Sequence, residues 1–275
     1  MNTNDVLRPL EKTLHSHGNV FAKVVLLVVF AFLWAPIAVL TFMSFAEGVL
    51  AFPPEGISFE WYQEFIGNTQ ARSSIWTSLQ VSLVATPVAV AMAIMYSYAF
   101  ARYDFPGKGV VTVLIALPLI VPLIVVGVGL TMFFGMLGGT GTYWEVVIAH
   151  IVRILPFAAL IILPSFLSFD TTLEEASMDL GASPLQTFRQ VTLPNILPGV
   201  IAGGLLAFTI SFNEFVYTYF VRGTGMETMP IYLWGRIAHT MTPEINVISV
   251  FFLAIATVTV ALAIIITDVE RISIR

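Results

Sequence analysis

The sequence of 275 residues is 57% hydrophobic and 11% charged, with a mean hydropathy of +0.90. An ordinary soluble domain is about 25% charged, so this composition excludes that class and predicts an all-α membrane protein. The chain has no cysteine and four scattered histidines, which predicts no metal site. A net charge of −5 offers no basic surface for nucleic acid.

Six apolar segments are long enough to cross a bilayer, which takes about 20 residues. They are 21–45, 75–101, 109–134, 143–168, 196–220 and 245–267. The sequence therefore predicts a transmembrane domain of six helices over residues 21–268. It is preceded by a polar segment, 1–20, and followed by a short tail, 269–275.

An even number of spans places both termini on the same side of the membrane. Most basic residues lie on that side, at Arg8, Lys12, Lys23, Arg102, Lys108, Arg189, Arg271 and Arg275, whereas the opposite loops hold Arg72, Arg222 and Arg236. Lys and Arg concentrate in cytoplasmic loops. We therefore expect both termini and the polar segment 170–195 to be cytoplasmic.

The polar segment 170–195 separates two strongly apolar halves, and its first part has the pattern of a short helix. Thr171 and Glu174 have the spacing of a capping box. Gly181 is the residue type that ends helices in the left-handed conformation, so the helix should stop at Leu180.

A second short helix is predicted directly after this glycine. Ser183 is a favourable N-cap, Pro184 suits the first helical position, and Gln186 completes another capping box. This helix should end before Pro194. The pair would expose Leu173, Ala176, Leu180, Leu185 and Phe188, which predicts that the segment enters a groove on another protein.

Proline and glycine are frequent inside the predicted spans, which indicates helices that bend. The densest cluster runs from Pro118 to Pro122 and is followed by Gly127 and Gly129. We expect Pro122 to lie beside a pathway through the bundle.

Arg153 and Glu214 are ionisable residues deep inside predicted spans, where a charge costs at least about 2.5–3.5 kcal/mol. Both lie within about 9–15 Å of the outer ends of their spans at 1.5 Å per residue. They are therefore at depths that allow an ion pair. The alternative is that one or both line a translocation pathway.

Two neighbours extend this candidate pathway. Asn213 adjoins Glu214, and His150 lies one helical turn before Arg153. For His150, a structural histidine with satisfied hydrogen bonds is the alternative. A single carboxylate suits a cation or an amine, whereas Arg153 and Glu214 together would suit a small zwitterion.

The polar segment resembles the signature of permease subunits of binding-protein-dependent ABC importers, E-A-A-x3-G-x9-I-x-L-P. The matching positions are Glu175, Ala176, Ser177, Gly181, Val191, Leu193 and Pro194, with Ser177 and Val191 as mild departures. Phe59, Trp61, Tyr62, the Pro118–Pro122 run and the sequence 155–157 add a weaker resemblance to the spermidine/putrescine class.

This resemblance implies a type I importer permease fold in the prokaryotic inner membrane, with a cytoplasmic coupling helix pair. It implies two ATP-binding partner subunits, an extracytoplasmic substrate-binding protein and surrounding lipid. It also implies a second permease subunit, either a homologous chain in a heterodimer, which the polyamine resemblance favours, or a second copy in a homodimer. The residues implied to couple to the ATPase are Glu174, Glu175, Ala176, Ser177, Asp179, Gly181, Ala182, Ser183, Pro184, Leu193 and Pro194.

The chain lacks the G-x-x-x-x-G-K-[ST] motif of a nucleotide site, so ATP and Mg²⁺ are expected in the partner ATPase and no cofactor in this chain. The chain is therefore predicted to be a transport subunit and not an enzyme. Polyamine paralogues of this class carry paired acidic residues where this chain has Asn213 and Glu214. The expected solute is a polyamine or another amine-bearing or zwitterionic compound. The alternative function is an ion- or proton-coupled secondary transporter or channel that acts without an ATPase.

Overall fold

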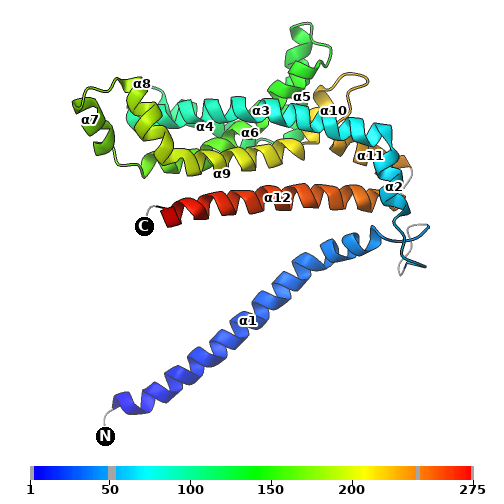
Figure 1. The fold of residues 1–275 in the computed structure, drawn as a ribbon, viewed down its shortest axis with the longest axis horizontal. Coiled ribbons are helices and arrows are strands. Elements are labelled where there is room, and N and C mark those ends of the chain that lie inside the picture. Colours follow the sequence, from blue (N-terminus) through cyan, green and yellow to red (C-terminus); the bar gives the residue numbers. More distant parts are fainter. Residues whose placement is uncertain (1–2, 49–53, 240–241, 274–275) are drawn as a thin grey trace. The chain divides into compact units, whose positions relative to one another are not determined.

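The computed structural model describes residues 3–48, 54–239 and 242–273, and these residues are almost entirely helical (Figure 1). The helices are α1 (Thr3–Met43), α2 (Glu60–Gly67), α3 (Thr69–Arg102), α4 (Lys108–Ile120), α5 (Leu123–Met136), α6 (Tyr143–Leu167), α7 (Thr172–Asp179), α8 (Pro184–Thr187), the π-helix η1 (Phe188–Thr192), α9 (Leu193–Phe212), α10 (Val216–Val221), α11 (Met229–His239) and α12 (Glu244–Ser273). This confirms the predicted all-α class.

The chain divides into two compact parts, and residues 1–64 with 241–250 form the first. After α1 the chain turns back through a single β-bridge between Ala46 and Ile57. The ring of Phe45 stacks on Tyr62 at 5.1 Å, and the Tyr62 hydroxyl lies 2.7 Å from Ser44 Oγ. These contacts join the residues directly after α1 to α2 (Glu60–Gly67).

The second part comprises residues 65–240 and 251–275, and its core is the packing of α3, α6 and α9 (Figure 1). The buried face of α3 consists almost entirely of small residues, Ala71, Ser74, Ser78, Val81, Ser82, Ala85, Ala89, Ala93 and Ser97. Small residues let helix backbones approach closely, and in a membrane this packing replaces the hydrophobic effect as the cause of association.

The close approach of α6 and α9 depends on a glycine in α9. A Cβ atom added at Gly203 would lie 2.9 Å from Ile162 Cγ1 and 3.3 Å from the carbonyl oxygen of Ala158. Ile162 and Ala158 are fully buried in the core. Gly203 therefore sets the distance between these two helices.

The third predicted span is broken between α4 and α5, whose axes differ by 111° (Figure 1). Val121 has an extended backbone, with φ −73° and ψ 137°. The residue before a proline is pushed away from the helical region, so Pro122 accounts for the break. Pro122 then becomes the N-cap of α5.

The fifth predicted span, 196–220, is wrong as a continuous helix. α9 ends at Phe212, and α10 begins at Val216 after a short irregular stretch. Glu214 lies in this stretch, so the break falls at the charged residue that the sequence placed inside a span. A carboxylate there can accept hydrogen bonds from the backbone groups that the break leaves unpaired.

Among the described residues, four helices are long and apolar enough to cross a membrane, or five if the bent α4–α5 pair counts as one. The apolar stretch Glu244–Thr259 of α12 is shorter than these helices. The six-span organisation over 21–268 therefore stays a prediction. Of the flanking segments, residues 3–20 continue α1 and 269–273 continue α12, while 1–2 and 274–275 lie outside the described residues.

The prediction that the second short helix ends before Pro194 is also wrong. The helical chain runs without a break from Pro184 to Phe212 through the π-helix η1. The amide of Leu193 donates across the wider turn to the carbonyl of Phe188. A proline lacks an N–H and its ring crowds the preceding turn, and a π-helical turn relieves both effects.

Candidate functional site

The polar segment 170–195 folds as a helix pair around Gly181. α7 ends as predicted, because Gly181 has a φ of +92° and follows the C-cap Leu180. The amide of Ala182 donates to the carbonyl of Ser177 at 3.1 Å, and that of Gly181 donates to Met178 at 2.9 Å. This pair of bonds is a Schellman motif, which favours glycine at the left-handed position.

The N-terminus of α8 confirms the second predicted capping box. The Ser183 hydroxyl accepts from the Gln186 amide, and the Gln186 side chain accepts from the Ser183 amide at 2.8 Å. Pro184 occupies the first turn, where its missing N–H leaves no donor unpaired.

The first capping box, Thr171 with Glu174, is wrong. Thr171 has a helical backbone and makes no side-chain cap. Asp170 Oδ1 caps α7 instead, because it accepts from the Thr172 amide at 3.0 Å and from the Thr172 hydroxyl at 2.8 Å. These two bonds hold the pKa of Asp170 below its ordinary value of 3.8, and the bond from the Thr172 backbone amide has the larger effect.

Glu174 points into the protein and pairs with Arg102, at the last turn of α3. Arg102 Nε lies 2.9 Å from Glu174 Oε2, and Arg102 Nη2 lies 3.1 Å from Oε1. The Thr192 hydroxyl also donates to Glu174 Oε1 at 2.6 Å. The two charged side chains are only 13% and 12% exposed.

The other predicted coupling residues fall into an outer and an inner group. Glu175, Ala176 and Asp179 on α7 and Ser183, Pro184 and Pro194 beyond it are exposed. Ala182 and Leu193 are half-buried, and Ser177 Oγ lies 3.1 Å from the Thr187 hydroxyl, which joins α7 to α8.

The helix pair exposes most of the apolar side chains that the sequence predicts. Leu180 is 91% exposed and Leu185 is 66% exposed, and Leu173 and Ala176 also face outward. The prediction that Phe188 is exposed is wrong. Its ring packs edge-on against Tyr98 of α3, with 5.7 Å between the ring centroids. The exposed apolar surface therefore belongs to α7 and the first turn of α8.

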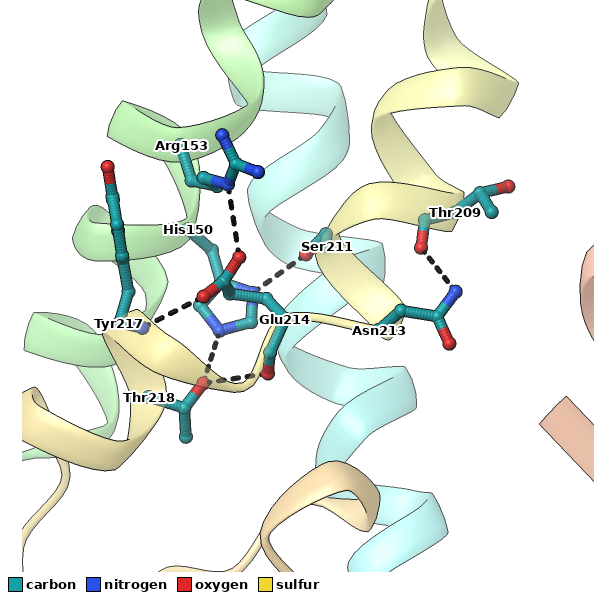
Figure 2. Close-up of polar contacts among 8 residues, drawn as sticks. All are labelled: His150, Arg153, Thr209, Ser211, Asn213, Glu214, Tyr217 and Thr218. Atoms are coloured by element: carbon teal, nitrogen blue, oxygen red, sulfur yellow. Dashed lines mark hydrogen bonds and ion pairs between the residues drawn. The ribbon is translucent and has the colours of Figure 1, made fainter. Parts of the chain in front are cut away.

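A second polar cluster lies between α6 and the break after α9 (Figure 2). Arg153 Nε lies 3.2 Å from Glu214 Oε2, and the Glu214 side chain is 5% exposed. Glu214 Oε1 accepts from the Tyr217 amide at 2.8 Å, so the carboxylate also caps α10. The Arg153 guanidinium lies 5.0 Å from the ring centroid of Phe157. The predicted ion pair is therefore present.

His150 is fully buried beside this pair and bridges the two sides of the break (Figure 2). Its Nδ1 lies 2.8 Å from Ser211 Oγ in α9, and its Nε2 lies 2.8 Å from Thr218 Oγ1 in α10. The Thr218 hydroxyl donates to the carbonyl of Glu214, so Nε2 donates to Thr218 and Nδ1 accepts from Ser211.

The two remaining pathway candidates do not join the cluster. The Asn213 side chain is exposed and donates to the carbonyl of Thr209 one turn earlier, at 2.9 Å (Figure 2). Pro122 is exposed at the start of α5, whose Thr131 hydroxyl donates to the carbonyl of Phe220 in α10 at 2.8 Å. Pro122 is thus linked to the break only through helix packing.

Four residues that complete these sites were not singled out from the sequence: Arg102, Thr192, Ser211 and Thr218. Arg102 contributed only to the count of basic residues. A signal existed for Ser211 and Thr218, since a histidine inside an apolar span needs two polar partners. Neither set of residues has the ligands for a metal: within the described part of the chain, no group of three His, Asp or Glu could hold one.

Comparison with known proteins identifies the family. The profile of the family described as "Binding-protein-dependent transport system inner membrane component" matches residues 85–269. The spermidine/putrescine transport system permease protein PotC of Haemophilus influenzae is 30% identical over 87% of this chain and 93% of its own length. The putrescine transport system permease protein PotI of Escherichia coli K12 is 32% identical over 84% of each chain.

Solved structures agree on the fold. A chain of a bacterial ABC transporter involved in the import of the acidic polysaccharide alginate has a TM-score of 0.68 at 15% identity, over 94% of this chain and 98% of its own. A chain of an amino acid ABC transporter has a TM-score of 0.58 at 16% identity, over 78% and 99%. The chain therefore belongs to the family of binding-protein-dependent transport system inner membrane components, has the fold of ABC importer permeases, and is a transport subunit, not an enzyme.

Proposed function

We propose that this protein is one of two permease subunits in an ATP-driven importer for a polyamine or a related amine-bearing solute. The α7–α8 helix pair docks on the partner ATPase, and the residues around the break between α9 and α10 line the solute pathway. ATP and Mg²⁺ bind in the ATPase. A substrate-binding protein delivers the solute on the opposite side of the membrane.

The helix pair is the observation that carries this proposal. α7 has no buried residue, and Leu180 and Leu185 expose apolar surface beside the acidic Glu175 and Asp179. Such a surface is costly to leave in water and suits a groove with basic residues. A channel or secondary transporter needs no such element.

Basic residues indicate on which side of the membrane the 170–195 segment lies. Arg102 contacts Glu174, so the end of α3 and the 170–195 segment lie on the same side of the membrane. Arg102, Lys108 and Arg189 are all at this end, which supports a cytoplasmic location by the positive-inside rule. The termini would then also be cytoplasmic.

The solute class rests on the names of the relatives and on Glu214. PotC and PotI are permeases for spermidine and putrescine. In this chain Glu214 is paired with Arg153, so an amine reaches the carboxylate only by exchanging with the guanidinium. The same relatives include differently named proteins of one transport class, which favours a heterodimer with a second, homologous permease.

Affinity purification of the tagged chain in mild detergent tests the assembly. The wild-type protein should retain an ATPase and a second permease, identified by mass spectrometry. A Glu175→Arg, Gly181→Trp double variant should lose the ATPase and keep the permease, because it changes only the helix pair. A wild-type protein that is stable alone, with an unchanged double variant, would overturn the importer assignment.

Uptake of radiolabelled putrescine and spermidine tests the solute. The Arg153→Met, Glu214→Gln variant removes both charges of the pair but keeps an oxygen that accepts from Tyr217, so assembly should be preserved while uptake falls. Wild-type uptake in this complex would contradict the pathway role. Glu64→Gln is the control, because it removes an exposed carboxylate in α2, outside the break.

A further inference from the structure

The two adjacent acidic residues of α7 have opposite surroundings, and this difference points to a second function within the helix pair. Glu175 is exposed, whereas Glu174 is 12% exposed and is bound by Arg102 and Thr192. We propose that Arg102, Glu174 and Thr192 form the joint that transmits movement of α7 to α3 and α9. This inference rests on the proposed docking of α7 to an ATPase.

The joint connects three elements that are far apart in sequence. Arg102 ends α3, Glu174 lies in the first turn of α7, and Thr192 ends the π-helix that leads into α9. Glu174 Oε1 accepts from both Arg102 Nη2 and the Thr192 hydroxyl. One carboxylate therefore holds both membrane helices to the same point of α7.

The geometry of the joint is suited to transmitting force. Two parallel N–H···O bonds between a guanidinium and a carboxylate fix the relative orientation of the two groups as well as their distance. The cation–aromatic contact of Arg102 with Phe169, at 5.4 Å, further restrains the guanidinium. Thr192 is 1% exposed, so water cannot replace Glu174 as the acceptor of its hydroxyl group.

α7 has few other attachments. None of its residues is buried, and its apolar side chains face outward. Its other side-chain link is from Ser177 to Thr187 in α8, which belongs to the same helix pair. Without the joint, a push on α7 would reach α3 less directly, through α8 and the contact of Phe188 with Tyr98.

The π-helix η1 lies directly next to the joint. Its wider turn lies between α8 and α9, directly where Thr192 contacts Glu174. π-helical turns are rare and frequently lie at functional sites. This turn lies where movement of the joint would reach α9.

The test compares Arg102→Gln with Lys108→Gln in the full transporter reconstituted into liposomes. Lys108 is the matched control, because its ion pair with Asp104 lies in the same turn but is exposed. Arg102→Gln should retain the ATPase and its hydrolysis, while solute uptake per ATP hydrolysed falls by about fivefold or more, the usual range of coupling effects. Lys108→Gln should behave as wild type.

The double variant Arg102→Gln, Glu174→Gln tests whether Arg102 and Glu174 act together as a joint or contribute independently to coupling. If the two residues act as one unit, the double variant should couple no worse than either single variant. Unchanged uptake per ATP in an assembled Arg102→Gln complex would overturn the proposal, and so would loss of the ATPase from that complex. Failure of the importer assignment is distinguishable, because wild type itself would then lack ATP-driven uptake.

A second measurement does not depend on transport. The chain has no cysteine, so spin labels can be attached at Met95→Cys on α3 and Leu180→Cys on α7, both of which are exposed. The label-to-label distance distribution should broaden in Arg102→Gln and stay narrow in Lys108→Gln. Equal widths in both variants would show that the pair does not hold α7, and would overturn the proposal.

Discussion

The arginine–carboxylate pairs Arg102–Glu174 and Arg153–Glu214 of this permease are built differently. Arg102 and Glu174 make two parallel bonds at the membrane edge, and a hydroxyl shares the carboxylate. Arg153 and Glu214 make one bond within the bundle, where the carboxylate is 5% exposed and also caps α10. The first pair joins separate helices, and the second stabilises a break between helices.

The two pairs also differ in their depth in the membrane, because Arg102 lies at the end of α3 and Arg153 lies inside α6. A charge at the edge of a bilayer keeps access to water when its partner is removed, whereas a charge inside the bundle does not. We therefore expect the inner cluster to determine whether the protein folds. The α7–α8 pair should determine how well the folded protein couples.

The largest effect is expected from Arg153→Met, which leaves Glu214 buried without its cation. Breaking a buried ion pair by removing one partner costs about 3–5 kcal/mol. The variant should give little monodisperse protein in size-exclusion chromatography and a lower thermal midpoint. The matched Arg153→Met, Glu214→Gln variant removes both charges and should recover much of the yield. Equal yields of the single variant and wild type would contradict a folding role for the pair.

A smaller effect is expected from His150→Phe within the same cluster. The aromatic ring fills a similar space, but the Ser211 hydroxyl on the α9 side of the break loses its partner. A buried polar group left unpaired costs about 1–3 kcal/mol. Thermal unfolding followed by tryptophan fluorescence should show a lower midpoint for His150→Phe than for the double variant His150→Phe, Ser211→Ala, which removes the unpaired hydroxyl as well. The reverse order would show that the histidine does not hold the break together.

These clusters show which features of the sequence were predictive. Ser183, Pro184 and Gln186 form their cap as predicted, because all its atoms come from four consecutive residues. Glu174 was assigned to a cap at Thr171, but Arg102 is 72 positions away in the sequence and binds it instead. The spacing of neighbouring residues in the sequence could not reveal that Arg102 competes with Thr171 for Glu174.

For the breaks in the predicted spans, too, a local cause could be predicted from the sequence and a distant partner could not. Apolar length alone indicates where a helix can cross the membrane, and it predicts 196–220 as one segment. The chain breaks at Glu214, where Arg153 and His150 of α6 supply partners for the buried side chains of Glu214 and Thr218. The proline at 122 is a local signal, and the break beside it could have been predicted from the sequence.

Gly181→Ala tests the helix pair with a more modest change. An added Cβ would meet no atom within 4 Å, so the cost comes only from the φ of +92°. A residue with a side chain in the left-handed region costs about 1–2 kcal/mol. Hydrogen exchange should speed up in α7 and leave α3 and α6 unchanged. Gly181→Asn should have a weaker effect, since asparagine tolerates this conformation. Faster exchange throughout the bundle would show that the turn supports the fold as well.

The smallest effect concerns the cap of α7 by Asp170. Hydrogen bonds from Thr172 lower the pKa of Asp170 in the folded protein. A carboxylate with a lowered pKa contributes its full stabilisation above the pKa of the unfolded chain, and this contribution is lost as the pH falls through the folded value. The protection of the first turn of α7 should therefore be constant from neutral pH to about pH 4 and decline below it.

Asp170→Asn isolates this effect from the other carboxylates of α7. Asparagine keeps an oxygen that can accept from the Thr172 amide, but it does not titrate in this range. Amide hydrogen exchange at Thr172, normalised to the intrinsic rate at each pH, should decline in acid for wild type and stay level for the variant. If both proteins decline together, a group other than Asp170 controls the acid response of this turn, and the cap is not its cause.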